Sequence, residues 1–265
     1  MIGFIGGGNM AEALIKGARG EGYGAREEIL VSEPNNERRG YLEHTYGVTT
    51  TPSNAEVVSS CSIIFLAVKP QNMEAVLSEI AAGIDSAKTV VSIAAGITLS
   101  YLQSKLKTDK IIRVMPNTPA LVQEGMSVMS LCECFAGTEI NIVRTILMSV
   151  GRVMTLPERH MDAVTALSGS GPAFIALFLE AMIDIGEKMG LSRDDAAQLA
   201  VQTAVGTAKL LDTGMSPEKL RQMVTSPGGT TAAGLKVFED RGLKPLVADA
   251  LMAAQKRAGE LGKKV

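Results

Sequence analysis

The stretch Ile2-Gly3-Phe4-Ile5-Gly6-Gly7-Gly8-Asn9-Met10-Ala11 decides the fold of this 265-residue chain. A short apolar run ends at Ile5 and leads directly into a Gly-x-Gly-x-x-Ala turn, after which apolar residues recur at helical spacing. Gly6 permits the tight turn, Gly8 lets the backbone approach a pyrophosphate, and Ala11 allows close helix–strand packing. A second strand is expected at residues 28–32. The sequence therefore predicts dinucleotide binding by the turn and the start of the helix, which are Gly6, Gly7, Gly8, Asn9, Met10 and Ala11.

The end of the second strand bears on the choice of dinucleotide, because it should meet the adenosine ribose roughly 20 residues after the glycine turn. Glu33 stands there, and its carboxylate can accept hydrogen bonds from both ribose hydroxyls, which favours NAD. Arg38 and Arg39 follow. Either guanidinium can pair with the extra phosphate of NADP or belong to a solvated helix face. The residues leave the preference between NADPH and NADH open.

Apolar runs and helical patterns alternate through the first part of the chain. Near-continuous apolar runs are typical of strands buried on both faces of a parallel sheet. They lie at residues 62–68, 90–94 and 111–115, with shorter strand patterns at 127–130 and 152–155. The alternation predicts an α/β, Rossmann-like, doubly wound and mainly parallel sheet over residues 1–157.

From residue 162 onward strand patterns disappear and helical patterns rich in Ala and Gly take over. About 100 residues of helix make a thin core on their own. We therefore expect an all-α dimerisation domain over residues 158–265 that a second copy covers, with packing on the first domain as the alternative.

Ligands of doubly wound sheets bind beyond the carboxyl ends of the strands. The residues expected beside the cofactor are Ala67, Val68, Lys69, Pro70, Ala94, Ala95 and Gly96. Lys69 suits a phosphate or a substrate, but an ordinary solvated lysine is an equal alternative. The Gly-rich turn at residues 168–172 either approaches a ligand or only lets two helices cross.

A second glycine turn, Ser226-Pro227-Gly228-Gly229-Thr230-Thr231, precedes a helical pattern near the other end of the chain. Unpaired N–H groups at a helix start point together at an anion such as a small carboxylate, and Thr231 adds a neutral hydroxyl. An ordinary capped turn is the alternative. Opposite a nicotinamide, this set suits a protonated imine, which needs orientation and a hydrogen bond to nitrogen more than a strong acid. We expect the two glycine turns to meet across a cleft. The predicted substrate-binding residues are Ser226, Gly228, Gly229, Thr230 and Thr231, with Thr231 as the catalytic residue.

The composition argues against several other classes of protein. A net charge of −2 provides no basic face for nucleic acid. Three cysteines and two histidines are too few for a disulfide framework or a metal site, and Cys132 and Cys134 are expected to be ordinary thiols. The longest uncharged apolar stretch, residues 163–179, is interrupted at 168–172, whereas a membrane span needs about 20 apolar residues in helical form. No signal peptide is recognised, so we expect a cytoplasmic protein without membrane contact.

Together these motifs resemble the pyrroline-5-carboxylate reductase family over essentially the full length of the chain. The most specific stretch is residues 224–231, with Gly234-Leu235 and Phe238-Glu239 behind it. Supporting stretches are residues 5–10, 67–70, 91–96, 113–119 and 167–173.

The resemblance implies that the chain reduces 1-pyrroline-5-carboxylate to L-proline with NADPH or NADH, in proline biosynthesis. It also implies a helical domain that interlocks into a homodimer, with dimers forming a decamer-like ring. By this likeness Asn54 reaches the adenosine side of the cofactor, and Thr231 meets the ring nitrogen of the substrate. Glu33 departs from the neutral Ser or Asn that the family often has, which weakens the expectation of NADP.

Two alternatives to this function remain at the level of sequence. A β-hydroxyacid dehydrogenase also pairs a Rossmann domain with helices, but it needs a lysine early in the first long helix, and residues 173–187 contain none. A nicotinamide-binding sensor without catalysis is the other alternative, and only the apparently complete substrate turn argues against it.

Overall fold

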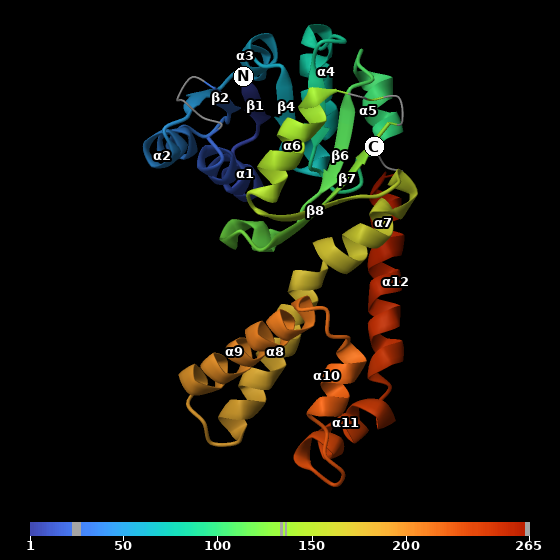
Figure 1. Cartoon of the computed structure of the whole chain (residues 1–265). Helices are drawn as coiled ribbons and strands as arrows, with labels where there is room; N and C mark the ends of the chain where they lie inside the picture. Colours follow the sequence, from blue (N-terminus) through green and yellow to red (C-terminus); the bar gives the residue numbers. More distant parts are fainter. Residues whose placement is uncertain (23–27, 133–134, 136, 263–265) are drawn as a thin grey trace. The chain divides into compact units, whose positions relative to one another are not determined.

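The computed structural model describes residues 1–22, 28–132, 135 and 137–262. Its eight-stranded sheet has the order β3-β2-β1-β4-β5-β6-β7-β8 (Figure 1). All neighbouring strands are parallel except β6 and β7. The order reverses at β1, as in other doubly wound sheets, and the predicted Rossmann-like fold is confirmed. The strands are β1 Ile2–Ile5, β2 Ile29–Ser32, β3 Thr49–Thr51, β4 Ile63–Leu66, β5 Thr89–Ser92, β6 Ile111–Met115, β7 Gly125–Leu131 and β8 Gly151–Thr155.

Helices cover both faces of the sheet (Figure 1). One face packs against α1 and α6 through residues such as Leu14 and Ile146, and the other packs against α3, α4 and α5 through residues such as Leu77 and Leu102. The helices around the sheet are α1 Asn9–Gly20, α2 Asn36–Tyr46, α3 Asn54–Ser60, α4 Met73–Ile80, α5 Leu99–Lys105 and α6 Thr138–Met148, with short 3₁₀ turns at Pro70–Asn72, Ala81–Gly83, Thr118–Val122 and Glu158–His160. Burial on both faces explains why these strands read as continuous apolar runs.

The chain forms two compact units, one made of Met1–Ser170 with Ala254–Val265 and the other of Gly171–Ala253. The sheet and the short helix α7 Met161–Val164 lie in the first unit, which the end of the chain rejoins through the last turns of α12. The sequence-based boundary between residues 157 and 158 separates a cofactor-binding part from a substrate-binding and dimerisation part, and this functional division stays a prediction. The later helices are α8 Gly171–Lys188, α9 Arg193–Asp212, α10 Pro217–Met223, α11 Thr230–Asp240 and α12 Leu243–Gly262.

Large apolar side chains stand exposed on the helices of the second unit and in the turn after α8. Leu177 is 65% exposed, Met189 79% and Met252 64%. These values are high for residues of this kind, and contiguous exposed apolar surface commonly marks a contact with another chain. The helices themselves are well specified locally, since Ser192 and Ser216 accept the N–H groups of Asp195 and Lys219 at the starts of α9 and α10.

The expected interruption of the apolar stretch at residues 168–172 is wrong. Residues Thr165–Gly169 form a π-helical turn, in which the N–H of Ser170 donates to the carbonyl of Thr165 at 2.8 Å. The wider turn carries the helix into α8, so the helical stretch Glu158–Lys188 is long and apolar enough to cross a membrane by length and composition alone. The core helix of a soluble protein passes the same test.

Candidate functional site

The first glycine turn joins β1 to α1 and has the open backbone that an anion requires. Gly6 has a φ of +97°, and a Cβ added there would lie 2.8 Å from the carbonyl oxygen of Ala67. Gly8 precedes α1 with no side chain capping the helix, and a Cβ added to it would meet nothing within 4 Å. The first N–H groups of α1 therefore point into open space beside Gly8, as pyrophosphate binding requires.

Glu33, at the end of β2, is held by two backbone groups. Its Oε2 accepts the N–H of Gly7 at 2.9 Å and its Oε1 accepts the N–H of Asn35 at 2.9 Å. The carboxylate is thus fixed next to the glycine turn at the position where an adenosine ribose is expected in this fold.

Both arginines that follow Glu33 are already bound within the protein. The Nε of Arg38 donates to the carbonyl of Gly7 at 2.6 Å, and its Nη2 pairs with Glu12. Arg39 donates to the carbonyls of Glu33 and Pro34 at 2.7 and 3.0 Å. The charge of Arg38 is therefore balanced by Glu12, whereas among the described residues Arg39 bonds only to neutral oxygens.

Sequence reasoning missed Glu12, which lies in the first turn of α1. Its Oε1 accepts the hydroxyls of Tyr46 at 2.6 Å and Tyr41 at 2.9 Å, while Arg38 pairs with its other oxygen. Burial raises the pKa of Glu12, but the hydrogen bonds from Tyr46, Arg38 and Tyr41 outweigh it and leave this pKa below its ordinary value. No sequence motif marks the cluster, because the three partners of Glu12 lie 26 to 34 residues after it in the chain.

Asn54 opens α3, where Ser53 caps the helix. Its Oδ1 accepts the hydroxyl of Ser32 at 2.6 Å and its Nδ2 donates to Glu79 at 2.8 Å. Asn54 thus lies at the end of β2 with Glu33, and its contact with the adenosine side stays a prediction.

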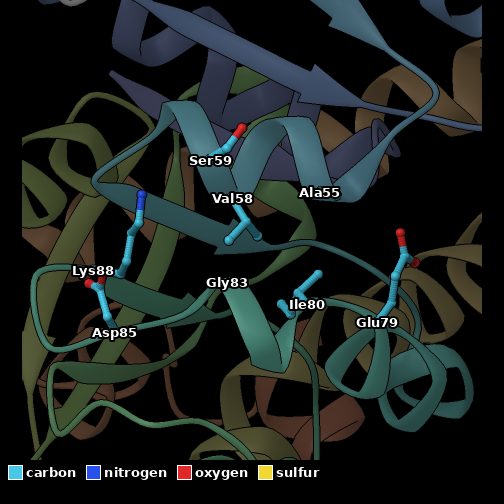
Figure 2. A pocket seen from close by; sticks show the side chains of 8 residues that line it. All are labelled: Ala55, Val58, Ser59, Glu79, Ile80, Gly83, Asp85 and Lys88. Carbon is cyan, nitrogen blue, oxygen red and sulfur yellow. The ribbon is translucent and has the colours of Figure 1, made fainter.

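A surface pocket of about 320 Å³ lies beyond α3, between that helix and the turn that follows α4 (Figure 2). Ala55, Ser59, Glu79, Asp85 and Lys88 are among its lining residues. None of the predicted site residues lines it, and Lys88 is engaged with the carbonyl of Cys61 at 3.0 Å. The pocket adjoins Asn54 through Glu79 but contains none of the predicted cofactor residues.

The residues after β4 and β5 lie at the same edge of the sheet as the glycine turn. The N–H of Ala67 donates to Ile5 at 2.8 Å, and the N–H of Ile93 donates to Leu66 at 3.3 Å. Lys69 is exposed. The structure thus places Ala67, Val68, Lys69, Pro70, Ala94, Ala95 and Gly96 beyond the carboxyl ends of these two strands.

The π-helical turn at residues 165–169 is tied to the sheet by Asn117. The Nδ2 of Asn117 donates to the carbonyl of Ser168 at 3.3 Å and lies 3.2 Å from its hydroxyl, while its Oδ1 accepts the N–H of Met126 at 2.8 Å. These bonds hold the turn within the first unit and do not decide between its two expected roles.

The second glycine turn lies in the other unit and opens α11. Gly228 has a φ of +73°, and the N–H of Gly229 donates to the carbonyl of Ser226 at 3.0 Å. Gly229 precedes the helix with no side-chain cap, and a Cβ added to it would lie 2.4 Å from the hydroxyl of Ser226. The first N–H groups of α11, including those of Thr230 and Thr231, are therefore open to a ligand such as a carboxylate.

The cysteines show one departure from expectation. Cys132 is disulfide-bonded, so the ordinary thiol expected there is wrong, and Cys134 lies outside the described residues. Burial raises the pKa of the free Cys61 thiol to about 11, which leaves it protonated and unreactive. Among the residues that the structure describes, no three His, Cys, Asp or Glu side chains are grouped so as to hold a metal ion.

Comparisons with known proteins agree on one family. The family described as pyrroline-5-carboxylate reductase dimerisation matches residues 158–261, and that described as NADP oxidoreductase coenzyme F420-dependent matches residues 1–96. A pyrroline-5-carboxylate reductase from Synechocystis is 44% identical over 99% of this chain and 98% of its own length. One from Pseudomonas aeruginosa is 41% identical over 100% and 97%.

A solved structure agrees with these sequences. Pyrroline carboxylate reductase from Plasmodium falciparum, crystallised with NADP bound, superposes with a TM-score of 0.88 at 33% identity and covers 98% of this chain and 97% of its own. Prephenate dehydrogenase from A. aeolicus, with a TM-score of 0.56 at 14% identity, shares the fold alone.

Proposed function

The chain belongs to the pyrroline-5-carboxylate reductase family, and from that premise we propose how its own residues serve the reaction. It is an NAD(P)H-dependent oxidoreductase that reduces the cyclic imine 1-pyrroline-5-carboxylate to L-proline, and it works as a homo-oligomer. The observation that carries this function is the 44% identity to the Synechocystis reductase over 99% of the chain.

The first glycine turn fits the cofactor's pyrophosphate, because Gly8 faces open space and the first N–H groups of α1 are uncapped. When bound, the reduced nicotinamide supplies the hydride. Glu33 and Asn54 would lie on the adenosine side, and the residues after β4 and β5 would flank the nicotinamide side. The residues proposed to hold the cofactor are Gly6, Gly7, Gly8, Asn9, Met10, Ala11, Glu33, Asn54, Ala67, Val68, Lys69, Pro70, Ala94, Ala95 and Gly96.

The second glycine turn would bind the substrate through its carboxylate. We propose that the backbone at Ser226, Gly229 and Thr230 holds this group, with Gly228 supplying the left-handed turn. The Thr231 hydroxyl would meet the ring nitrogen, which carries a proton in the reactive imine and keeps it in proline. No strong acid is needed, because the protonated C=N bond is already electrophilic, so orientation provides most of what the protein adds.

The assay that tests this function follows loss of NAD(P)H absorbance with each cofactor in turn. The substrates are 1-pyrroline-5-carboxylate, its six-membered analogue, and a set of 3-oxoacids, with 3-hydroxyacids and NAD(P)⁺ for the reverse direction. Turnover with the five-membered imine and none with the oxoacids is expected. Turnover of oxoacids alone would favour the β-hydroxyacid dehydrogenase alternative, and cofactor binding without turnover would favour a sensor.

Glu33→Ser is expected to raise the ratio of kcat/KM with NADPH to that with NADH by roughly tenfold, since it removes a fixed negative charge that repels a 2′-phosphate. The change also releases the N–H groups of Gly7 and Asn35. Steady-state kinetics with both cofactors measure the ratio. Glu37→Ser, an exposed acid in the first turn of α2, is the matched control. An unmoved ratio in Glu33→Ser would show that this carboxylate does not face the ribose.

We propose that the partner copy covers the helices of residues 158–261, which the dimerisation family matches. The exposed side chains of Leu177, Met189 and Met252 support this proposal. The long apolar helical stretch Glu158–Lys188 supports it too, because a dimer interface would cover its apolar surface without a membrane. The division into a cofactor domain at 1–157 and a substrate and dimerisation domain at 158–265 agrees with the range matched. We also propose that the dimers interlock and assemble into a decamer. The proposed location is the cytoplasm, without contact with nucleic acid or a membrane. Light scattering of the purified protein measures the oligomer size directly.

A further inference from the structure

A buried cation lies on strand β6, close to the loop that follows β5. Arg113 on β6 is 4% exposed and pairs in register with Ser92, the last residue of β5. Its Nη1 lies 2.9 Å from Oε1 of Glu158, and its Nη2 lies 3.9 Å from Oδ1 of Asp162. A guanidinium at this depth requires a charged partner, because an unpaired buried charge is costly.

The same oxygen of Glu158 has a second partner on that loop. Oε1 accepts the N–H of Leu99 at 2.7 Å, and Leu99 is the first residue of α5. The hydroxyl oxygen of Thr98 accepts the N–H of Tyr101 and caps the helix there. The N–H of Leu99 is not satisfied by this cap, and Glu158 is its acceptor. Arg113 thus orients the carboxylate of Glu158, which accepts the backbone N–H at the point where the β5–α5 loop enters α5.

The last turn of α12 supports the loop from another direction. Gly96 has a φ of +78°, and a Cβ added to it would lie 3.1 Å from the Cβ of Leu261. A Cβ added to Gly262 would in turn lie 2.9 Å from the carbonyl oxygen of Gly96. The loop is therefore confined between the end of α12 and the α5 start that Glu158 holds.

We propose that Glu158, oriented by Arg113, is a positioning residue that holds the β5–α5 loop in the shape that receives the nicotinamide half of the cofactor. The inference rests on the proposed placement of Ala94, Ala95 and Gly96 beside the nicotinamide. Glu158 itself touches neither cofactor nor substrate, and it acts through the N–H of Leu99.

The test compares Glu158→Ala, Glu158→Gln and Asp162→Asn in the full-length protein. Both Glu158 variants lose the negative charge beside Arg113, but glutamine keeps an oxygen that can accept the N–H of Leu99. Asp162→Asn also removes a negative charge near Arg113, and Asp162 makes no hydrogen bond to Leu99. Hydrogen exchange of the Leu99 amide is measured without cofactor, and the Kd for NADPH and NADH is measured by titration of cofactor fluorescence.

Glu158→Ala is expected to speed exchange at Leu99 and to weaken cofactor binding, each by about tenfold, the equivalent of one lost charge-assisted hydrogen bond. Asp162→Asn is expected to stay within about twofold of the original protein in both measurements. Glu158→Gln keeps the acceptor but not the charge, and it is expected to lose clearly less than Glu158→Ala. Equal losses in Glu158→Gln, or none in Glu158→Ala, would overturn the proposal. Faster exchange without weaker binding would show that the loop is held but lies away from the cofactor, and would also overturn it.

A second variant serves if Glu158→Ala does not fold. Glu158→Asp keeps the negative charge beside Arg113 but shortens the side chain by one methylene group, which withdraws the carboxylate from the N–H of Leu99. Cofactor binding about tenfold weaker is expected, and unchanged binding would overturn the proposal. Turnover of the imine by the unmodified protein tests the proposed function separately.

Discussion

Thr231→Ala is expected to lower kcat/KM for 1-pyrroline-5-carboxylate, with a loss of transition-state stabilisation of about 1–3 kcal/mol. This is the effect of losing one hydrogen bond to a polar partner. Thr231 is the second residue of α11 and follows the uncapped Gly229. Among the described residues its hydroxyl has no hydrogen-bond partner, so this group is available to a ligand. Steady-state kinetics with saturating cofactor measure the effect.

Two further substitutions at the same position separate the hydroxyl from the shape of the side chain. Thr231→Val keeps the volume and loses the hydroxyl, and is expected to match Thr231→Ala. Thr231→Ser keeps the hydroxyl and is expected to retain most of the activity. Since a hydroxyl acting on the ring nitrogen leaves the cofactor untouched, the Kd for NADPH should stay constant across all three. A valine variant with normal kinetics would remove Thr231 from the mechanism.

Gly6→Ala is expected to weaken cofactor binding and to lower the free energy of unfolding by about 1–3 kcal/mol, because alanine is strained at a left-handed backbone position. The φ of +97° at Gly6 is one cause, and the 2.8 Å approach of an added Cβ to the carbonyl of Ala67 is the other. That carbonyl belongs to the backbone and has little freedom to move. Urea unfolding and titration of NADPH fluorescence measure the two losses.

Gly8→Ala is the matched control for this turn, because it makes the same change without either cause of backbone strain. Gly8 has a φ of −70° and open space around its Cα, so alanine there should leave the unfolding free energy within about 0.5 kcal/mol of its original value. The added methyl group would still stand where the pyrophosphate approaches, so cofactor binding should weaken. If Gly8→Ala binds NADPH normally, the pyrophosphate does not lie against this turn.

Much of the sheet and of the two turns could be predicted from the sequence, because the signals are local. A strand buried on both faces must be apolar along its whole length, and the runs at β1, β4, β5 and β6 show this. The glycines at positions 6, 96 and 228 mark φ values of +97°, +78° and +73° that few other residues adopt. The stretch at residues 168–172 was misjudged, because a glycine- and proline-containing segment can continue a helix through a π-turn.

The polar contacts around the turns could not be predicted in the same way. Whether Arg38 binds a phosphate or Glu12 depends on side chains 26 residues apart, and Glu158 meets Leu99 across 59 residues. Local propensity carries no information about such pairs, since many exposed Glu and Arg residues look alike in sequence.

By itself, the sequence determined that this protein has a doubly wound sheet with a dinucleotide turn, a helical second part and a glycine turn suited to a carboxylate. These features follow from backbone rules that act over a few neighbouring residues. Only the tertiary structure decided that Glu33 is fixed to Gly7, that Arg38 and Arg39 are already bound, and that Glu158 and the end of α12 confine the loop after β5. The physical reason is that a hydrogen bond or ion pair needs atoms within about 3–4 Å, and only the folded chain brings such distant residues together.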